Sequence, residues 1–296
     1  MPLAITLTAA PDSGPLLAEA AVHIECALGY PLERHWLAEG EALDLLAPAD
    51  RTALAGVRDT VAGIVEKRPI DFCAQDAGRR RKRMLIADMD STIIGQECID
   101  EMADLKGIKP AIAALTERAM RGELEFAAAL RERIRLLEGL TQDDLRRILD
   151  ERITLNAGAG TLVRTMKANG ACTVLVSGGF TFFSRAVAAR AGFAKHRANT
   201  LIWENGRLAG VVEPILGREA KRDALVEEAA ACGVALADVI AVGDGANDLD
   251  MLMAAGLGVA YRAKPAVAAR ADACVNHSDL TALLYFQGYS RESFVS

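Results

Sequence analysis

The sequence predicts an α/β protein, in which a parallel sheet covered by helices is preceded by a smaller α+β unit. Three observations support this prediction. After residue 84, short apolar runs typical of buried strands alternate with runs of helical spacing, and several apolar runs end at polar residues. Residues 1–75 show a second, shorter alternation of strand-like and helix-like stretches. Of the 296 residues, 51% are hydrophobic, which is too apolar a share for a disordered chain.

The net charge of the chain argues against nucleic acids as partners. The chain has 34 Lys and Arg against 40 Asp and Glu, which gives a formal net charge of −6. Nucleic-acid binding needs a basic face, and an aromatic share of 5% also disfavours stacking on bases. We therefore expect no nucleic-acid partner.

The segment 1–75 is predicted to fold in the order strand, helix, strand, strand, helix, strand. The six stretches are 4–9, 15–29, 34–38, 42–46, 51–66 and 70–74. This is the ferredoxin-like order, and it resembles an ACT-type domain. The resemblance implies a regulatory unit or a dimerisation unit that would make the protein a homodimer. No residue of the segment stands out as a ligand.

The polar stretch 76–83 is predicted to be a linker. It ends in five consecutive cations, Arg79, Arg80, Arg81, Lys82 and Arg83. Such a basic run can also be a nucleic-acid or targeting patch. The acidic total charge favours a linker, and the second domain then covers residues 84–296.

The second domain is predicted to contain the parallel sheet. Its strands are expected at 84–87, 173–176, 239–242, 257–261 and 273–275, with helices such as 185–191 and 221–231 between them. Apolar strands that alternate with helices indicate a sheet buried on both faces. Ligands of such sheets bind beyond the carboxyl ends of the strands.

Two segments depart from this alternation. Residues 94–156 contain charged amphipathic helices, for example 124–137 and 142–152, and are predicted to form an all-helical cap over the carboxyl edge of the sheet. Residues 199–213 are predicted to form a hairpin whose turn lies near Asn205 and Gly206.

The clearest chemical motif is Asp88-Met89-Asp90-Ser91-Thr92, directly after the first strand of the second domain. Two carboxylates at one strand end can hold a cation through their oxygens. They can also divide nucleophilic attack and proton transfer between them. In isolation, such a pair is about as often two solvated turn residues.

Three further features lie at other strand ends and helix starts. Ser177 and the two glycines after it offer a hydroxyl and free backbone N–H groups to an anion. Asp244 and Asp248 would complete the oxygen shell of Mg²⁺ beside the first pair. Lys221 supplies a fixed positive charge. Each of these features is common by itself. All four in this order, each at a strand end or a helix start, argue for a shared site.

The four motifs are similar to those of the haloacid dehalogenase superfamily of phosphotransferases, over residues 84–280. The resemblance implies a Rossmann-like core with a helical cap insertion. It also implies that Asp88 attacks phosphorus to form an aspartyl-phosphate, with Asp90 as the general acid and base.

The same resemblance implies a magnesium site and a phosphate site. Mg²⁺ would be held by Asp88, a backbone oxygen of Asp90, and Asp244, with Asp248 behind these ligands. The groups expected to hold or orient the phosphoryl oxygens are Ser177, Gly178, Lys221 and Asn247.

Within the predicted cap, the sequence resembles the phosphoserine phosphatases of this superfamily. The matching residues are Glu97, Met120, Phe126 and Arg133. The resemblance implies O-phospho-L-serine as the substrate, hydrolysed to L-serine and phosphate in the last step of serine synthesis. Glu97 would pair with the ammonium and Arg133 with the carboxylate, while Met120 and Phe126 would exclude water. From its spacing alone, Arg133 is more readily one of several solvated charges on its helix.

Two alternatives stay open. A related phosphohydrolase or phosphotransferase could act on another small phosphate, such as phosphothreonine, or on a homoserine acceptor. A regulatory protein could keep the fold and lose catalysis, although the complete set of motifs opposes this.

The remaining sequence features indicate a cytoplasmic protein. The longest apolar stretches, such as 252–261, are too short to span a membrane, which excludes an ion pump of the same chemistry. The N-terminus lacks the pattern of a signal peptide. The six Cys form no C-x-x-C pair, so we expect buried thiols in a reduced cytoplasm and neither a zinc site nor a disulfide framework.

Overall fold

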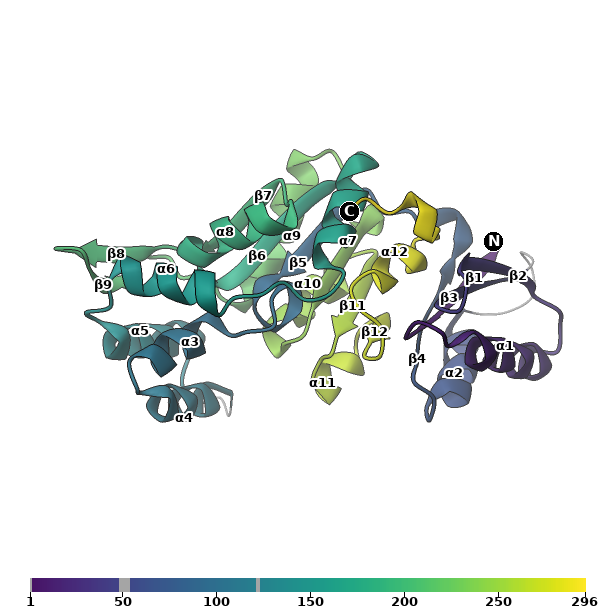
Figure 1. Cartoon of the computed structure of the whole chain (residues 1–296), viewed down its shortest axis with the longest axis horizontal. Helices are drawn as coiled ribbons and strands as arrows, with labels where there is room; N and C mark the ends of the chain where they lie inside the picture. The colour runs from purple at the N-terminus through teal and green to yellow at the C-terminus, as the bar shows by residue number, and fades with distance from the viewer. Residues whose placement is uncertain (1, 48–53, 121–122) are drawn as a thin grey trace.

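The computed structural model describes residues 2–47, 54–120 and 123–296, with the side chain of Met120 left out. The molecule is elongated, and its three parts follow one another along the long axis (Figure 1). The helical cap lies at one end, the parallel sheet in the middle and the N-terminal unit at the other end. In these residues, no helix is long and apolar enough to cross a membrane.

The N-terminal unit has the predicted order of elements. They are β1 (Leu3–Ala9), α1 (Gly14–Leu28), β2 (Glu33–Ala38), β3 (Ala42–Ala47), α2 (Leu54–Val65) and β4 (Ile70–Asp76). The strands pair antiparallel in the order β2-β3-β1-β4, and both helices pack on one face through a shared apolar cluster. The start of the helix predicted at 51–66 lies outside the described residues. The ACT-type resemblance stays a prediction.

The core sheet is parallel, as predicted. Its strands are β5 (Met84–Asp88), β6 (Cys172–Phe180), β7 (Lys195–Asn199), β10 (Val239–Gly243), β11 (Leu257–Tyr261) and β12 (Ala273–Val275). They lie in the order β12-β11-β10-β5-β6-β7. This order places β5, which carries the first motif, between β10 and β6.

Helices cover both faces of this sheet, because alternate residues of each strand point to opposite sides. Leu85 and Ala87 pack with α7 (Ala159–Ala168), α8 (Thr181–Ala191) and α12 (Ala282–Phe286). Met84 and Ile86 pack on the other side with α9 (Arg218–Ala231), α10 (Leu249–Ala254) and α11 (Pro265–Ala268).

Strand β7 was not predicted from the sequence. Its residues, Lys-His-Arg-Ala-Asn, contain a single apolar side chain, and only Asn199 at its end is buried. The strand lies at the edge of the sheet, where polar side chains remain in contact with water. Hydrophobic periodicity therefore does not reveal it.

In its described residues, the predicted cap at 94–156 contains helices and no strand. Its helices are α3 (Cys98–Leu105), α4 (Lys109–Met120), α5 (Phe126–Leu137) and α6 (Gln142–Glu151). A bridge between Ile94 and Leu155 closes the insertion at its base. The predicted hairpin forms β8 (Leu201–Glu204) and β9 (Arg207–Val211), and joins the cap by a bridge from Arg207 to Thr141. Its turn residues Asn205 and Gly206 have φ of 50° and 77°, as a tight hairpin turn requires.

The N-terminal unit and the core share one sheet of ten strands, because β4 pairs antiparallel with β12. Buried polar contacts reinforce this junction. The carboxylate of Asp71 accepts backbone N–H bonds from Asn276, His277 and Ser278, at 2.7–3.2 Å. Gln75 donates a side-chain hydrogen bond of 2.7 Å to the carbonyl of Phe286.

The segment predicted as a basic linker contacts both units. Arg80 forms an ion pair with the buried Asp44 of β3. Arg81 lies over the ring of Tyr289 at 3.5 Å from its centroid, and Lys82 donates to the carbonyl of Ala237 at 3.0 Å. Its cations therefore serve as attachments in the folded chain.

The expectation that the cysteines are buried thiols was wrong for Cys172 and Cys232, which are bonded, and for Cys26, which is exposed. Cys172, at the start of β6, is joined by a disulfide to Cys232, which follows α9. The other four cysteines are free. A sequence separation of 60 residues gives no sign of this contact, which the packing of α9 on β6 creates.

We predict that Asp71→Ala lowers the free energy of unfolding by about 3 kcal/mol, because three backbone N–H groups lose a charged acceptor. Urea unfolding of the full chain measures the effect. Asp59→Ala, on the exposed face of α2, is the matched control and should change the midpoint little. Equal midpoints for the two variants would contradict the role given to Asp71.

Candidate active site

Apart from Met120, whose side chain lies outside the described residues, the predicted site residues meet at the carboxyl edge of the sheet, beneath the cap. Asp88 ends β5, Ser177 lies near the end of β6, and Asp244 follows β10. A cavity of about 450 Å³ opens there. It is lined by Asp88, Asp90, Glu97, Phe126, Arg133, Gly178, Lys221, Asp244 and Asn247, among others. Titratable side chains from segments that are far apart in the sequence therefore face the same cavity.

Lys221 forms the centre of the site. Its Nζ lies 2.7 Å from Oδ1 of Asp88 and 2.6 Å from Oδ1 of Asp248, and each of the three residues is at most 5% exposed. Burial disfavours the ammonium, but the charges of Asp248 and Asp88 outweigh it and raise the pKa of Lys221. Burial, followed by the negative charge of Asp248, raises the pKa of Asp88 well above its ordinary value.

Three carboxylates could hold a metal ion. Asp88, Asp244 and Asp248 each offer an oxygen, and these atoms lie within 4.8 Å of one another. Both oxygens of Asp248 accept hydrogen bonds, from Lys221 and from the backbone N–H of Gly245 at 2.9 Å. The predicted place of Asp248 behind the direct ligands stays a prediction. A donor set of carboxylate oxygens fits a hard divalent cation.

Asp244 is oriented by a residue that the sequence analysis did not assign. Thr92, fully buried after β5, donates its hydroxyl to Oδ1 of Asp244 at 3.0 Å. Burial and the charge of Asp248 raise the pKa of Asp244 to about 6. Thr92 belongs to the first motif, so the sequence places it near the site. The sequence does not show its partner Asp244, which lies 152 residues later.

Asp90 is held in a different environment from Asp88. Its Oδ1 accepts the backbone N–H of Cys98 at 2.8 Å, and its Oδ2 accepts the hydroxyl of Ser177 at 3.0 Å. Burial raises its pKa above the ordinary value. Two neighbouring carboxylates, one beside an ammonium and one without, are suited to different roles.

Asn199 is a second residue that the sequence analysis did not assign. Its side chain donates to the carbonyl of Gly178 at 2.8 Å and accepts the backbone N–H of Leu216 at 2.7 Å. It is 2% exposed and lies at the end of the polar edge strand β7. It therefore links the glycine turn of β6 to the segment that leads into α9.

The cap supplies Glu97, Phe126 and Arg133. Glu97 accepts the hydroxyl of Ser91 at 2.6 Å, and loss of hydration, with the charge of Asp90, raises its pKa to about 7. Arg133 is half-buried and lines the same cavity. The Phe126 ring packs so closely on two core glycines that a Cβ added at Gly217 would lie 3.3 Å from it. The side chain of Met120 lies outside the described residues.

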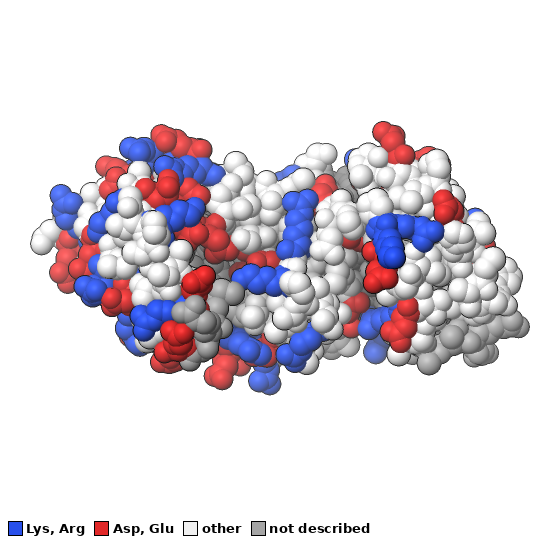
Figure 2. Space-filling view, turned by 90° about the horizontal axis from the view of Figure 1, so that it is seen from below, with Lys and Arg blue, Asp and Glu red and all other residues white. Residues whose placement is uncertain are grey.

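One outer face of the molecule has a different distribution of charge from the buried site (Figure 2). On the face seen in Figure 2, acidic and basic side chains are intermingled over the cap, at the left. The N-terminal unit, at the right, shows broad uncharged areas on this face. The buried acidic groups around Lys221 are thus set apart from the mixed charges of this outer face.

We predict that Lys221→Met lowers the free energy of unfolding by about 3–5 kcal/mol at pH 8, because Asp88 and Asp248 lose their buried cation. The loss should shrink toward pH 5. Without the ammonium, the pKa of Asp88 lies still higher above its unfolded value, so the folded variant takes up a proton as the pH falls and gains stability.

Urea unfolding in EDTA at several pH values measures this effect. The control is Lys195→Met, which removes a half-exposed partner of Glu228 and should cost about 1 kcal/mol or less. A loss that is small, or that does not depend on pH, would contradict the buried ion pairs.

Comparisons with known proteins identify the family of this chain. The haloacid dehalogenase-like hydrolase family matches residues 85–253. The phosphoserine phosphatase of Albidiferax ferrireducens is 46% identical over 208 residues, which are 68% of this chain and 88% of that protein.

Solved structures share the fold over nearly the whole chain. A haloacid dehalogenase family hydrolase from Salmonella enterica serovar Typhi has a TM-score of 0.86 at 29% identity, covering 96% of this chain and 98% of its own. The unliganded structure of a probable phosphoserine phosphatase from Vibrio cholerae has a TM-score of 0.79 at 29% identity, covering 98% and 88%. With its family match over residues 85–253 and these relatives, the chain belongs to the haloacid dehalogenase-like hydrolases.

Proposed function

We propose that the protein is a phosphoserine phosphatase, which hydrolyses O-phospho-L-serine to L-serine and phosphate. The observation that carries this proposal is that one cavity is lined both by the Asp88, Lys221 and Asp244 cluster and by two cap residues of opposite charge, Glu97 and Arg133. The first group suits a phosphoryl group, and the second suits a zwitterionic amino acid. The relatives named phosphoserine phosphatase support the same substrate.

In this proposal, Asp88 is the nucleophile. Its Oδ1 is occupied by the backbone N–H of Met89 and by Lys221, so we assign Oδ2 to the attack on phosphorus. The bond from Oδ2 to phosphorus forms as the bond from phosphorus to the serine oxygen breaks. Splitting hydrolysis into two displacements through an aspartyl-phosphate makes each step easier than direct attack by water.

Asp90 is assigned the proton transfers. Its raised pKa favours the protonated form that donates to the departing serine oxygen. The carboxylate that remains then accepts a proton from the water that attacks the aspartyl-phosphate. The N–H of Cys98 keeps Asp90 in one orientation through both steps, and Ser177 donates to Asp90 before the substrate binds.

The phosphoryl oxygens are assigned to Lys221, Ser177 and the backbone N–H of Gly178, with Asn247 orienting the phosphate. Asn199 fixes the carbonyl of Gly178 and so positions this turn. Phosphoryl transfer depends mainly on positioning and on neutralisation of charge. These groups provide both, and none of them forms or breaks a covalent bond.

We assign Mg²⁺ to Asp88, a backbone oxygen of Asp90, and Asp244, with Asp248 holding Lys221 and the turn at Gly245 in place. The ion would neutralise negative charge on the phosphoryl group. The predicted cytoplasmic location, and the predicted homodimer and ACT-like regulation through the N-terminal unit, stay proposals.

We predict that Asp88→Asn lowers the release of phosphate from O-phospho-L-serine by at least about 10³-fold, because an amide is no nucleophile at this position. Phosphate release with Mg²⁺ present measures the effect. Asp143→Asn, an 89% exposed residue of the cap, should leave the rate unchanged. Retained turnover in Asp88→Asn would overturn the proposed mechanism.

Arg133→Ala tests the substrate. It should lower kcat/KM for O-phospho-L-serine by about 100-fold, because the carboxylate loses a charge-assisted pair, and leave an aryl phosphate nearly unaffected. Arg131→Ala is the matched control, because Arg131 pairs with Glu213 on the surface at 2.7 Å.

Equal losses on both substrates would remove the carboxylate role of Arg133. A higher kcat/KM for phosphothreonine than for phosphoserine would favour the alternative of a related phosphohydrolase.

A further inference from the structure

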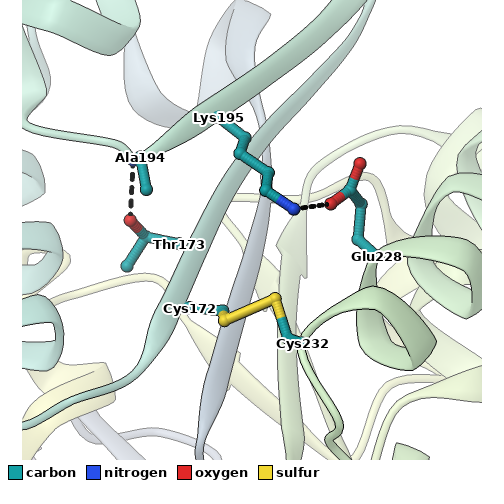
Figure 3. Close-up of a disulfide and its surroundings, with 6 residues drawn as sticks. All are labelled: Cys172, Thr173, Ala194, Lys195, Glu228 and Cys232. Carbon is teal, nitrogen blue, oxygen red and sulfur yellow. Dashed lines mark hydrogen bonds and ion pairs between the residues drawn. A yellow bond between two sulfur atoms is a disulfide. The ribbon is translucent and has the colours of Figure 1, made fainter.

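The disulfide between Cys172 and Cys232 lies on the side of the sheet that α9 covers, away from the catalytic edge. Cys172 is the first residue of β6, and Cys232 follows the last residue of α9 (Figure 3). Their Cα atoms are 6.6 Å apart, which is within the range that a disulfide spans. Both residues border the apolar cluster that fixes α9 to the sheet.

Helix α9 is held at this end in a second way. Glu228, one turn before Cys232, is 5% exposed and accepts hydrogen bonds from Lys195 and Arg197 of β7, at 2.7 and 2.8 Å. Figure 3 shows the Lys195 pair and the disulfide on the same side of the helix. The end of α9 is thus tied to β6 covalently and to β7 by charge.

The same helix carries Lys221 in its first turn. Because an α-helix is a stiff rod, fixing its last turn restrains its first turn as well. The disulfide therefore restrains the element that places the ammonium between Asp88 and Asp248.

We propose that Cys172 and Cys232 form a reversible redox site, whose oxidation by a low-molecular-weight disulfide stabilises the catalytic core. One protein thiolate attacks the small disulfide and releases one small thiol, which leaves a mixed disulfide. The second protein thiolate attacks the protein sulfur of that bond and releases the other small thiol. Two protein thiols are oxidised, and one small disulfide is reduced to two thiols.

Two observations support reversibility. Both cysteines are partly exposed, so small thiols and disulfides in solution reach them. The hydrogen bonds of Glu228 with Lys195 and Arg197 do not involve the disulfide, so we expect α9 to keep its place without the covalent bond. The reduced protein should therefore be folded and active, but less resistant to heat.

The test compares the full chain in reduced and oxidised glutathione. Peptide mapping should find a cross-linked peptide that contains Cys172 and Cys232 and disappears with dithiothreitol. The closed loop of 60 residues predicts a Tm about 5 °C higher in the oxidised form. Phosphatase activity at 25 °C should be the same in both forms.

Cys172→Ser and Cys232→Ser should each abolish the difference in Tm, whereas Cys26→Ser, an exposed free thiol, should keep it. Absence of the cross-linked peptide under oxidation would overturn the proposal. Equal Tm values for the two forms of the unmodified chain would overturn it as well. Neither readout depends on the substrate of the enzyme.

Discussion

The buried ion pairs of Lys221 with Asp88 and Asp248 are the interaction on which the rest of the site depends. They bring three charged side chains together out of water, from α9, the end of β5 and the segment after β10. Buried ion pairs of this kind rarely add net stability over apolar residues of the same size. The proposed chemistry accounts for them, because transfer of a phosphoryl group needs both a nucleophile and a fixed positive charge.

The architecture follows from the need to assemble this cluster. The strand order puts β5 between β6 and β10, so Asp88, the proposed nucleophile, lies between the glycines near the end of β6 and the acidic segment after β10. The cap is inserted directly after β5, which places Glu97 and Arg133 over the same cavity. Phe126 touches the core glycines and closes the space between cap and sheet. The N-terminal unit adds four strands to the far edge of the same sheet.

Much of this arrangement was predictable because its signals are local. Apolar runs marked β5, β6, β10, β11 and β12, and the cluster around Asp88 and Lys221 occupies strand ends and helix starts. The features that were not predicted depend on contacts between distant residues. Strand β7 is polar because it lies at an edge, and Asn199 acts only through Gly178 and Leu216. The disulfide and the pairing of β4 with β12 also follow from packing, which spacing along the chain does not encode.

The central claim is that Asp88 becomes covalently phosphorylated while Lys221 holds it in place. The most direct measurement is an acid-quenched single turnover with O-phospho-L-serine and Mg²⁺, followed by mass mapping of the peptides. The account predicts a transient phosphoryl group on the peptide that contains Asp88, strongly reduced in Lys221→Met. Turnover without any phosphorylated peptide, or with the phosphoryl group on another residue, would contradict it.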